Sequence, residues 1–189
     1  YIPNTIYWFK YEPVKWRVLD ASDPENLLVL SESILDSQAF RETRYSYSSK
    51  NSYYYYTDST MTYYANNYEQ SNIRAWLNGD FYNTTFSADE KSHIHTTTIT
   101  NEAYSTAYSK YDAASTQDKI FLMSYKEATN FACFNNSVAR YAEGSNYAKA
   151  MGLYVSSSGG TAGNSMWLLR SAGDYSYSAC CVEHDGIIR

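Results

Sequence analysis

The residues of this chain that could take part in catalysis do not form a recognised catalytic motif. His93 and His95 could lie on one face of an extended segment and bind a metal, but the sequence places no third ligand nearby. His184 and Asp185 could join a serine in a hydrolytic triad, yet the G-x-S-x-G signature of the nucleophile elbow does not occur. The sequence therefore predicts a protein that is not an enzyme and that holds no metal or other cofactor.

The cysteines Cys133, Cys180 and Cys181 are too few and too unevenly spaced for a disulfide framework or for paired zinc-binding motifs. We expect three reduced and mostly buried thiols. A bridge from Cys133 to one of the adjacent pair is the alternative.

Tyrosine is the most conspicuous side chain, with 22 copies, many of them in the region 44–70. This region is dominated by Tyr, Ser, Asn and Thr and shows no sustained periodicity, so we expect a long ordered loop. Tyr offers a large amphipathic surface with few rotatable bonds, and Ser and Asn offer adaptable hydrogen bonds, as in antibody loops. The predicted ligand-binding residues of the loop are Tyr45, Tyr47, Tyr53, Tyr54, Tyr55, Tyr56, Tyr63 and Tyr64. The alternatives are that the rings pack the loop against its own domain or drive self-association.

A second candidate surface is the segment 173–181, "GDYSYSACC", directly after a W-L-R-S sequence. Asp174, Tyr175 and Tyr177 are its predicted ligand-binding residues. Each residue from 174 to 181 can be reached by substituting adenines in an asparagine codon, which is the signature that a mutagenic retroelement would leave. Ordinary, non-variable residues are the alternative.

Composition limits the class of partner. Acidic residues outnumber basic ones by 20 to 15, and no stretch collects Lys and Arg into a stripe, so we expect no nucleic-acid partner. No apolar run approaches the ~20 residues that span a bilayer, so we expect a soluble protein without membrane insertion. The chain does not begin with Met and carries no signal-peptide pattern, so we expect any signal segment to lie outside it.

The elements that position these surfaces follow from hydrophobic periodicity. Val14, Trp16 and Val18 recur at every second position, which predicts a half-buried strand. Residues 25–33 follow the turn signal "DASDP" and predict the second strand of a hairpin. Further predicted elements are a short helix over 33–40 and strands over 118–124 and 166–173.

One helix is predicted after the tyrosine region. Ile73, Trp76 and Leu77 have the spacing of a buried helix face, with Ser71 as N-cap and Gly79 as the stop. Two more short helices begin with the reciprocal capping pattern, Ser87 with Glu90 and Ser124 with Glu127. Hairpins and short helices without alternating βαβ units predict an α+β fold, organised as one domain over residues 1–189 with a Tyr-rich insertion at about 44–70.

The conspicuous tryptophans and two of the arginines are interpreted as structural rather than functional. We expect Trp16, Trp76 and Trp167 in the core. We expect Arg74 and Arg170 to pair with buried carboxylates or carbonyls.

Six blocks in this order carry a family resemblance: "YEPVKWRVLD", "LLVLSESILDSQAF", "NNYEQSNIRAWLNGDFYNTTFSADEK", "DKIFLMSYKEATNF", "RYAEGSNYAKAMG" and "MWLLRSAG". With them the chain resembles the bacterial DUF6273 family over nearly its whole length. The resemblance implies a C-type-lectin-like or formylglycine-generating-enzyme-like fold, with short helices flanking mixed antiparallel sheets and a large loop-rich region. It also implies an extracellular or cell-surface location in gut or oral bacteria, and a relation to the variable proteins of diversity-generating retroelements.

The activities of that fold find little support in these residues. The copper-dependent relatives use two separated cysteines, whereas Cys180 and Cys181 are adjacent, and neighbouring strand side chains point to opposite faces. Calcium-dependent sugar binding uses E-P-N or Q-P-D and W-N-D motifs, which "EPV" at 12–14 and "WLL" at 167–169 break.

The end of the chain departs from the resemblance, because relatives continue beyond "EHDGIIR" into a strand that closes the sheet. Residues 181–189 suffice for one short hairpin around "DG". We therefore expect an open sheet edge, explained by truncation or by strand addition from another chain.

The sequence thus predicts a non-enzymatic extracellular or cell-surface module that binds a protein or glycan ligand through its Tyr- and Ser-rich loops. The alternatives are a structural surface protein that self-assembles and a degenerate enzyme of the formylglycine-generating type.

Overall fold

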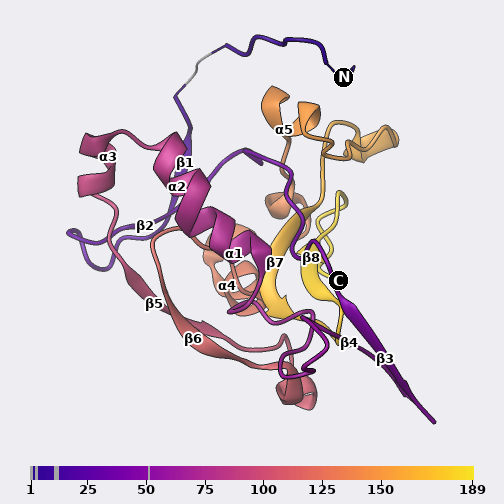
Figure 1. Cartoon of the computed structure of the whole chain (residues 1–189). Helices are drawn as coiled ribbons and strands as arrows, with labels where there is room; N and C mark the ends of the chain where they lie inside the picture. The colour runs from indigo at the N-terminus through magenta and orange to yellow at the C-terminus, as the bar shows by residue number, and fades with distance from the viewer. Residues whose placement is uncertain (1, 3, 11–12, 51) are drawn as a thin grey trace. The chain divides into compact units, whose positions relative to one another are not determined.

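A computed structural model describes residues 2, 4–10, 13–50 and 52–189, and it confirms the predicted α+β class (Figure 1). The chain divides into two compact units, each assembled from separate stretches of sequence. Unit 1 comprises residues 1–38, 131–167 and 182–187, and unit 2 comprises residues 39–130, 168–181 and 188–189.

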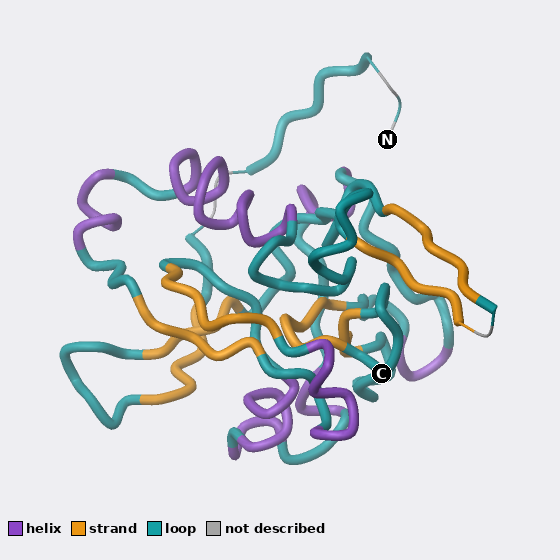
Figure 2. Tube along the Cα trace, turned by 60° about the horizontal axis from the view of Figure 1, so that its bottom comes forward, coloured by secondary structure: helices purple, strands orange, loops and turns teal. Residues whose placement is uncertain are grey.

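The strands pair two by two, so that the described residues form four two-stranded sheets (Figure 2). These are β1 (Trp16–Asp20) with β2 (Leu28–Ser31), β3 (Tyr45–Ser49) with β4 (Ser52–Tyr56), β5 (Thr97–Asn101) with β6 (Ala113–Asp118), and β7 (Trp167–Ala172) with β8 (Ala179–Val182). The α-helices are α1 (Asn72–Trp76), α2 (Tyr82–Thr85), α3 (Ala88–Ser92), α4 (Tyr125–Asn130) and α5 (Asn146–Ala150). A π-helical segment, η1 (Leu77–Phe81), and the 3₁₀ segments η2 (Thr106–Tyr111), η3 (Ala132–Phe134), η4 (Val138–Arg140) and η5 (Gly159–Thr161) complete the elements.

The first hairpin is confirmed, but its exposed face is the opposite of the predicted one. Strand β1 pairs antiparallel with β2, and the exposed side carries Val14, Trp16 and Val18. Trp16 is 43% exposed, so its assignment to the core is wrong. The other face carries the half-buried Arg17 and Leu19, and Arg17 pairs with Glu32 through two hydrogen bonds of 3.0 and 2.8 Å. The long stem of an arginine can cover apolar surface, which the alternation of apolar residues does not reveal.

The helix predicted over residues 33–40 is wrong. Ile34 forms a parallel bridge with Gly144, and the rest of this stretch has no regular secondary structure. The Ile34 N–H donates to the Glu143 carbonyl at 3.0 Å, and its carbonyl accepts from the Ser145 N–H at 2.9 Å. A distant segment therefore takes the backbone groups that a helix would have paired internally.

The helix after the tyrosine region is confirmed at its start and wrong at its end. The Ser71 side chain caps α1, and Ile73 and Leu77 are buried at 5% and 7% exposure. Gly79 does not stop the helix, which continues through η1 and α2 to Thr85. Gly79 does not adopt the left-handed backbone conformation with which glycine commonly ends a helix.

The same helix supplies the core of unit 2, in which Ile73 and Leu77 pack with Tyr68 and Ile99. Trp76 is half-buried at the margin of this cluster, where its ring lies 4.9 Å from that of Phe81. Its predicted burial is therefore only partial. In unit 1, Trp167 is also half-buried, and its indole N–H donates to the Arg140 carbonyl at 3.1 Å.

Both predicted capping boxes are present. The Ser87 hydroxyl accepts from the Glu90 N–H while the Glu90 carboxylate accepts from the Ser87 N–H, at the start of α3. Ser124 and Glu127 exchange the same two bonds, at 3.1 and 2.7 Å, before α4.

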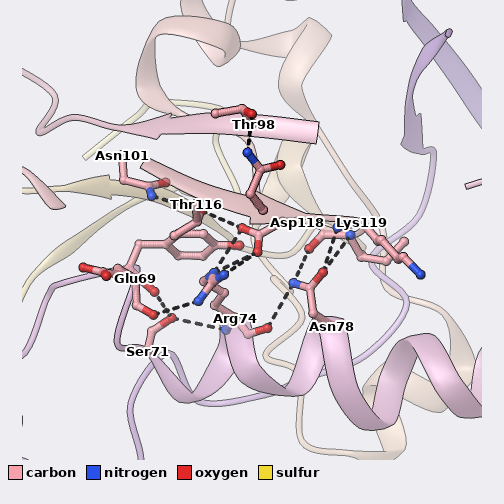
Figure 3. A network of polar contacts seen from close by, with 12 residues as sticks. Glu69, Ser71, Arg74, Asn78, Thr98, Asn101, Thr116, Asp118 and Lys119 are labelled. Carbon is pink, nitrogen blue, oxygen red and sulfur yellow. Dashed lines mark hydrogen bonds and ion pairs between the residues drawn. The ribbon is translucent and has the colours of Figure 1, made fainter. Parts of the chain in front are cut away.

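The strand predicted over 118–124 is wrong, because β6 ends at Asp118, where that stretch begins. The next residues have no regular structure, and the Asn78 side chain accepts from the N–H groups of Lys119 and Ile120 at 2.8 and 3.3 Å (Figure 3). Further along, the Met123 carbonyl accepts from the Arg170 N–H of β7 at 2.8 Å. Because single bonds of this kind pair the backbone, the apolar residues of the stretch pack against the core without forming a ladder. The pairing of β5 with β6 was not predicted, since "TTITN" and "AASTQD" lack a strong apolar alternation.

The two arginines are confirmed as partners of acidic groups within unit 2. Arg74 Nε lies 2.8 Å from the Asp118 carboxylate, whose side chain is fully buried (Figure 3). Arg170 binds Glu127 through two bonds of 2.6 and 2.8 Å and also donates to the carbonyls of Thr100 and Leu122.

The tyrosine region is not a loop throughout, which corrects the prediction. Its first part is the antiparallel hairpin β3–β4, seen in Figure 2 as a separate two-stranded ribbon. The alternation of tyrosine and serine in "YSYS" at 45–48 is the period-two signal that predicts it, because tyrosine is a strand-forming residue. The rest of the region, from Thr57 to Gln70, is turns and loop apart from an isolated bridge at Tyr64.

Three further observations bear on the sequence predictions. The three cysteines form no disulfide, and Cys180 is buried while the other two are partly buried, as expected. The short C-terminal hairpin is present, since Cys181 and Arg189 exchange two backbone hydrogen bonds of 2.8 and 2.9 Å. Within the described residues, no helix has the length and apolar character needed to cross a membrane.

Candidate functional site

The register of the β3–β4 hairpin divides its tyrosines between two faces. Residues directly opposite each other in an antiparallel pair share a face. One face therefore carries Tyr45, Tyr47, Tyr54 and Tyr56, and the other carries Ser46, Ser48, Tyr53 and Tyr55. The two sets of rings have different surroundings.

The face with Tyr54 and Tyr56 packs against other residues of unit 2, the unit to which the hairpin belongs. The ring of Tyr56 stacks on that of Tyr64 at 5.0 Å and 23°, and Tyr64 meets the buried Tyr111 edge to face at 4.9 Å. Burial, followed by the neighbouring Tyr64 hydroxyl, raises the pKa of Tyr56. The amino group of Lys110 lies 4.8 Å from the Tyr111 ring centre. We call Tyr54, Tyr56, Tyr64 and Tyr111 the packing cluster, and its contacts are those of a scaffold.

The other face forms an open pocket together with the segment after the W-L-R-S sequence. Tyr53 and Tyr55 meet edge to face at 5.2 Å, and Tyr55 meets Tyr177 in the same way at 5.1 Å. Tyr177 stacks on Tyr175 at 5.5 Å with only 13° between the ring planes. The pocket has a volume of ≈ 510 Å³ and is lined by Arg44, Tyr53, Tyr55, Tyr175 and Tyr177, which we call the tyrosine pocket.

Arg44 supplies the positive charge of this pocket. Its guanidinium carbon lies 4.4 Å from the Tyr55 ring centre and 5.6 Å from that of Tyr177. An arginine over an aromatic ring is attracted by the negative face of the ring. The sequence analysis did not identify Arg44, although it directly precedes the "YSYS" alternation and is two positions from Ser46, on the same face of the strand.

Hydrogen bonds within unit 2 hold the two halves of the pocket together. The Tyr55 N–H donates to the Ser176 hydroxyl at 2.8 Å. Asn66 donates its backbone N–H to the Ser176 carbonyl at 3.0 Å and its side-chain amide to the Tyr175 carbonyl at 2.8 Å. Asn66 is 1% exposed, so these bonds are shielded from water. These hydrogen bonds hold in place the backbone that carries Tyr175 and Tyr177.

A tight turn completes the segment that carries Tyr175 and Tyr177. The Gly173 N–H donates to the Ser178 carbonyl at 2.7 Å, and the Tyr175 N–H donates to the Ser178 hydroxyl at 3.1 Å. A Cβ atom on Gly173 would lie 2.7 Å from that hydroxyl, so glycine is required for this close approach.

The predicted ligand-binding residues therefore fall into three groups. The tyrosine pocket brings together Tyr53, Tyr55, Tyr175 and Tyr177 from both predicted surfaces. Tyr54, Tyr56 and Tyr64 belong to the packing cluster. Tyr45, Tyr47, Tyr63 and Asp174 are exposed and do not line the pocket.

The residues considered for catalysis do not gather around this pocket. His93 Nδ1 lies 2.9 Å from the Asp89 carbonyl, beside helix α3. Burial raises the pKa of the Cys180 thiol to about 12, with smaller contributions from Cys181 and Asp174. In the described parts of the chain, no group of three or more His, Cys, Asp or Glu side chains could hold a metal ion.

Comparison with known proteins places the chain in a family. Neither the curated proteins nor the solved structures include a significant match. The family model described as "Domain of unknown function (DUF6273)" matches residues 24–189, which include every residue of the tyrosine pocket and of the packing cluster. The chain therefore belongs to the DUF6273 family.

Proposed function

We propose that this chain is a non-enzymatic ligand-binding module, secreted or displayed at the surface of a bacterial cell, that holds its ligand in the tyrosine pocket. The observation that supports the proposal is the convergence of Tyr53, Tyr55, Tyr175 and Tyr177 around Arg44. Exposed tyrosines cost little conformational entropy when they are ordered by a ligand, and each offers both an apolar ring and a hydroxyl.

The proposal includes a C-type-lectin-like fold, which the six sequence blocks suggest and with which the α+β class agrees. That fold would present the segment after the W-L-R-S sequence as a ligand surface. Residues 174–181 would then vary among close relatives as the targets of a diversity-generating retroelement. The hydrogen bonds from Asn66 explain how the backbone could keep its conformation when these side chains change. They go to the carbonyl groups of Tyr175 and Ser176, which every amino acid has.

The test is binding of the immobilised chain to an array of bacterial and host glycans and to a panel of purified extracellular proteins. The double variant Tyr55→Ser/Tyr177→Ser removes two walls of the tyrosine pocket, and we expect it to lose whatever the wild-type chain binds. The matched control is Tyr47→Ser/Tyr63→Ser, which removes two exposed tyrosines outside the pocket and should keep the binding.

The control variant should melt within a few degrees of the wild-type chain, because Tyr47 and Tyr63 are exposed. Tyr55 is half-buried and contacts Tyr53 and Tyr177, so the pocket variant should melt at a lower temperature while remaining folded at the temperature of the binding assay. Equal retention of binding by the two double variants, or equal loss in both, contradicts the assignment of the pocket.

Self-assembly is a second candidate function, favoured by one observation. Every residue of β3 is exposed, and in its two-stranded sheet this strand has β4 as its neighbour on one side. A free strand edge is a template for pairing with another chain. Sedimentation velocity over a range of concentrations distinguishes the two functions. A monomer that binds ligand supports the first proposal. Reversible oligomers that dissociate when Ser48 is replaced by proline support the second.

A further inference from the structure

Arg44 differs from the other arginines of the chain between residues 17 and 170. Three of them pair with carboxylates, and two donate to backbone carbonyls. The pairs are Arg17 with Glu32, Arg74 with Asp118 and Arg170 with Glu127, and the two donors to carbonyls are Arg41 and Arg140. In the part of the chain that the structure describes, Arg44 has ring contacts and neither a carboxylate nor a carbonyl partner.

The chain has enough acidic residues to pair with Arg44, but none of the described ones is placed to do so. Acidic residues outnumber basic ones by 20 to 15, and Asp174 belongs to the same turn as Tyr175. Asp174 nevertheless does not line the tyrosine pocket. The only net charge that lines the tyrosine pocket, among the described residues, is therefore positive.

The ring contacts of Arg44 leave its hydrogen-bonding edge available. The guanidinium of arginine has five N–H donors, and among the described residues those of Arg44 bond to no carboxylate and no carbonyl. Arg44 is exposed, so these donors open to solvent or to a ligand. A carboxylate is the group whose two oxygens match two parallel N–H donors of arginine.

The walls of the pocket indicate what carries the carboxylate. Tyr175 and Tyr177 form a nearly parallel pair of rings, and Ser46 and Ser48 lie on the same face of the hairpin as Tyr53 and Tyr55. A sugar ring has one apolar face of C–H groups that packs on an aromatic ring, and a rim of hydroxyls that needs hydrogen-bonding partners. Tyrosine and serine hydroxyls provide those partners.

The size of the pocket favours a saccharide over a protein surface, and its single charge favours a saccharide over an acidic peptide. Its volume of ≈ 510 Å³ lies within the ~300–1,000 Å³ typical of small-ligand pockets. A stable protein–protein interface needs a larger surface, of roughly 800 Å² on each partner. One positive charge also matches one carboxylate, whereas an acidic peptide presents several.

We propose that the tyrosine pocket binds a saccharide that bears a carboxylate, a hexuronate unit, with Arg44 on the carboxylate and the sugar ring against Tyr175 and Tyr177. This inference rests on the proposed function and names the ligand class of the same site.

The experiment is an NMR titration of the ¹⁵N-labelled full chain, which detects weak binding and reports the Arg44 Nε–H signal directly. The probes are D-glucuronate, D-glucose, acetate and a tetra-aspartate peptide. We expect glucuronate to shift the signals of Arg44 and of residues 174–178, and to bind about tenfold or more tightly than glucose, because a charge-assisted pair is lost with glucose. Acetate should bind more weakly than glucuronate, because it lacks the ring. The glucuronate affinity should fall as the ionic strength rises.

Two charge-removing variants are compared. Arg44→Gln should lower the affinity for glucuronate about tenfold or more, to the level of glucose. Lys110→Gln is the matched control, because Lys110 is also an exposed cation beside tyrosine rings but lies at the packing cluster. It should leave the affinity unchanged.

Several results would overturn the inference. Glucose binding as tightly as glucuronate removes the role of the carboxylate, and acetate binding as tightly removes the role of the ring. Tetra-aspartate binding more tightly through Arg44 identifies an acidic peptide instead. If none of the four probes binds, the hexuronate assignment fails, while the proposed function is still decided by the array with the Tyr55→Ser/Tyr177→Ser variant.

Discussion

At the scale of single residues, Glu127 combines two structural roles in unit 2. Its carboxylate accepts from the Ser124 N–H at 2.7 Å and binds the buried Arg170 at 2.6 and 2.8 Å. Burial acts to raise the pKa of Glu127, but the hydrogen bond and charge of Arg170 and the bonds from Ser124 outweigh it. The pKa therefore lies below the ordinary value of 4.5.

The lowered pKa of Glu127 predicts a pH dependence of stability. A carboxylate whose pKa is lower in the folded state contributes stability that is complete above its unfolded pKa and is lost as the pH falls through the folded pKa. The free energy of unfolding should thus decrease below about pH 4.5. Urea unfolding of wild type and Glu127→Gln, followed from about pH 7 to pH 3, measures this effect.

In Glu127→Gln the buried Arg170 loses its counter-charge, so the variant should be less stable at neutral pH by on the order of 3 kcal/mol. Its stability should also depend less on pH than that of wild type in the acid range. The same acid slope in both proteins would assign the pH dependence to other carboxylates.

At the scale of elements, the helix that begins at Ser71 shows how a local stop signal can be overridden. Gly79 lies inside η1, between α1 and α2, instead of ending the helix. The helix continues because Leu77 and Tyr82 are both buried at 7% and 8% exposure, on either side of the glycine. Tertiary burial on both sides of Gly79 outweighs the helix-breaking tendency of glycine.

Gly79→Ala is therefore expected to stabilise the protein by about 0.5–1 kcal/mol, since alanine loses less backbone entropy in a helix. Space permits the change, because a Cβ atom on Gly79 would meet nothing within 4 Å. Gly173→Ala is the matched control and should destabilise, because its Cβ would lie 2.7 Å from the Ser178 hydroxyl. Thermal and urea unfolding of the two variants measure both signs, and a destabilised Gly79→Ala would show that the π-helical geometry itself needs glycine.

At the scale of the whole molecule, residues that pack together in unit 2 come from distant parts of the chain. The core of unit 2 comes from residues 39–130, yet Leu169 and Arg170 of β7, which are fully buried, belong to the same unit. Arg170 donates to the Thr100 and Leu122 carbonyls and binds Glu127, so one distant side chain satisfies three groups of this unit. The unit is complete only when residues 168–181 are present.

The isolated fragment 39–130 should consequently fail to fold, because it retains buried polar groups without their partner. Joining residues 168–181 to it through a flexible Gly/Ser linker should restore a folded spectrum. Circular dichroism and dispersion of the amide NMR signals measure the outcome. A cooperative unfolding transition in the fragment alone would show that β7 is dispensable.

The sequence by itself determined the features that depend on neighbouring residues. These include the first hairpin, the Ser71 cap, both capping boxes and the α+β class, because turns and caps are made within a few residues. It also identified Arg74 and Arg170 as partners of carboxylates or carbonyls. The family follows from the order of the sequence blocks.

Only the tertiary structure decided which tyrosines belong together and what accompanies them. Tyr55 and Ser176 are 121 positions apart and meet through one hydrogen bond, which no local pattern encodes. Adjacent residues of β4 point to opposite faces, so identical tyrosines divide into the packing cluster and the tyrosine pocket. Arg44 becomes notable only in three dimensions, because its lack of an acceptor among the described residues depends on where their carboxylates and carbonyls are placed.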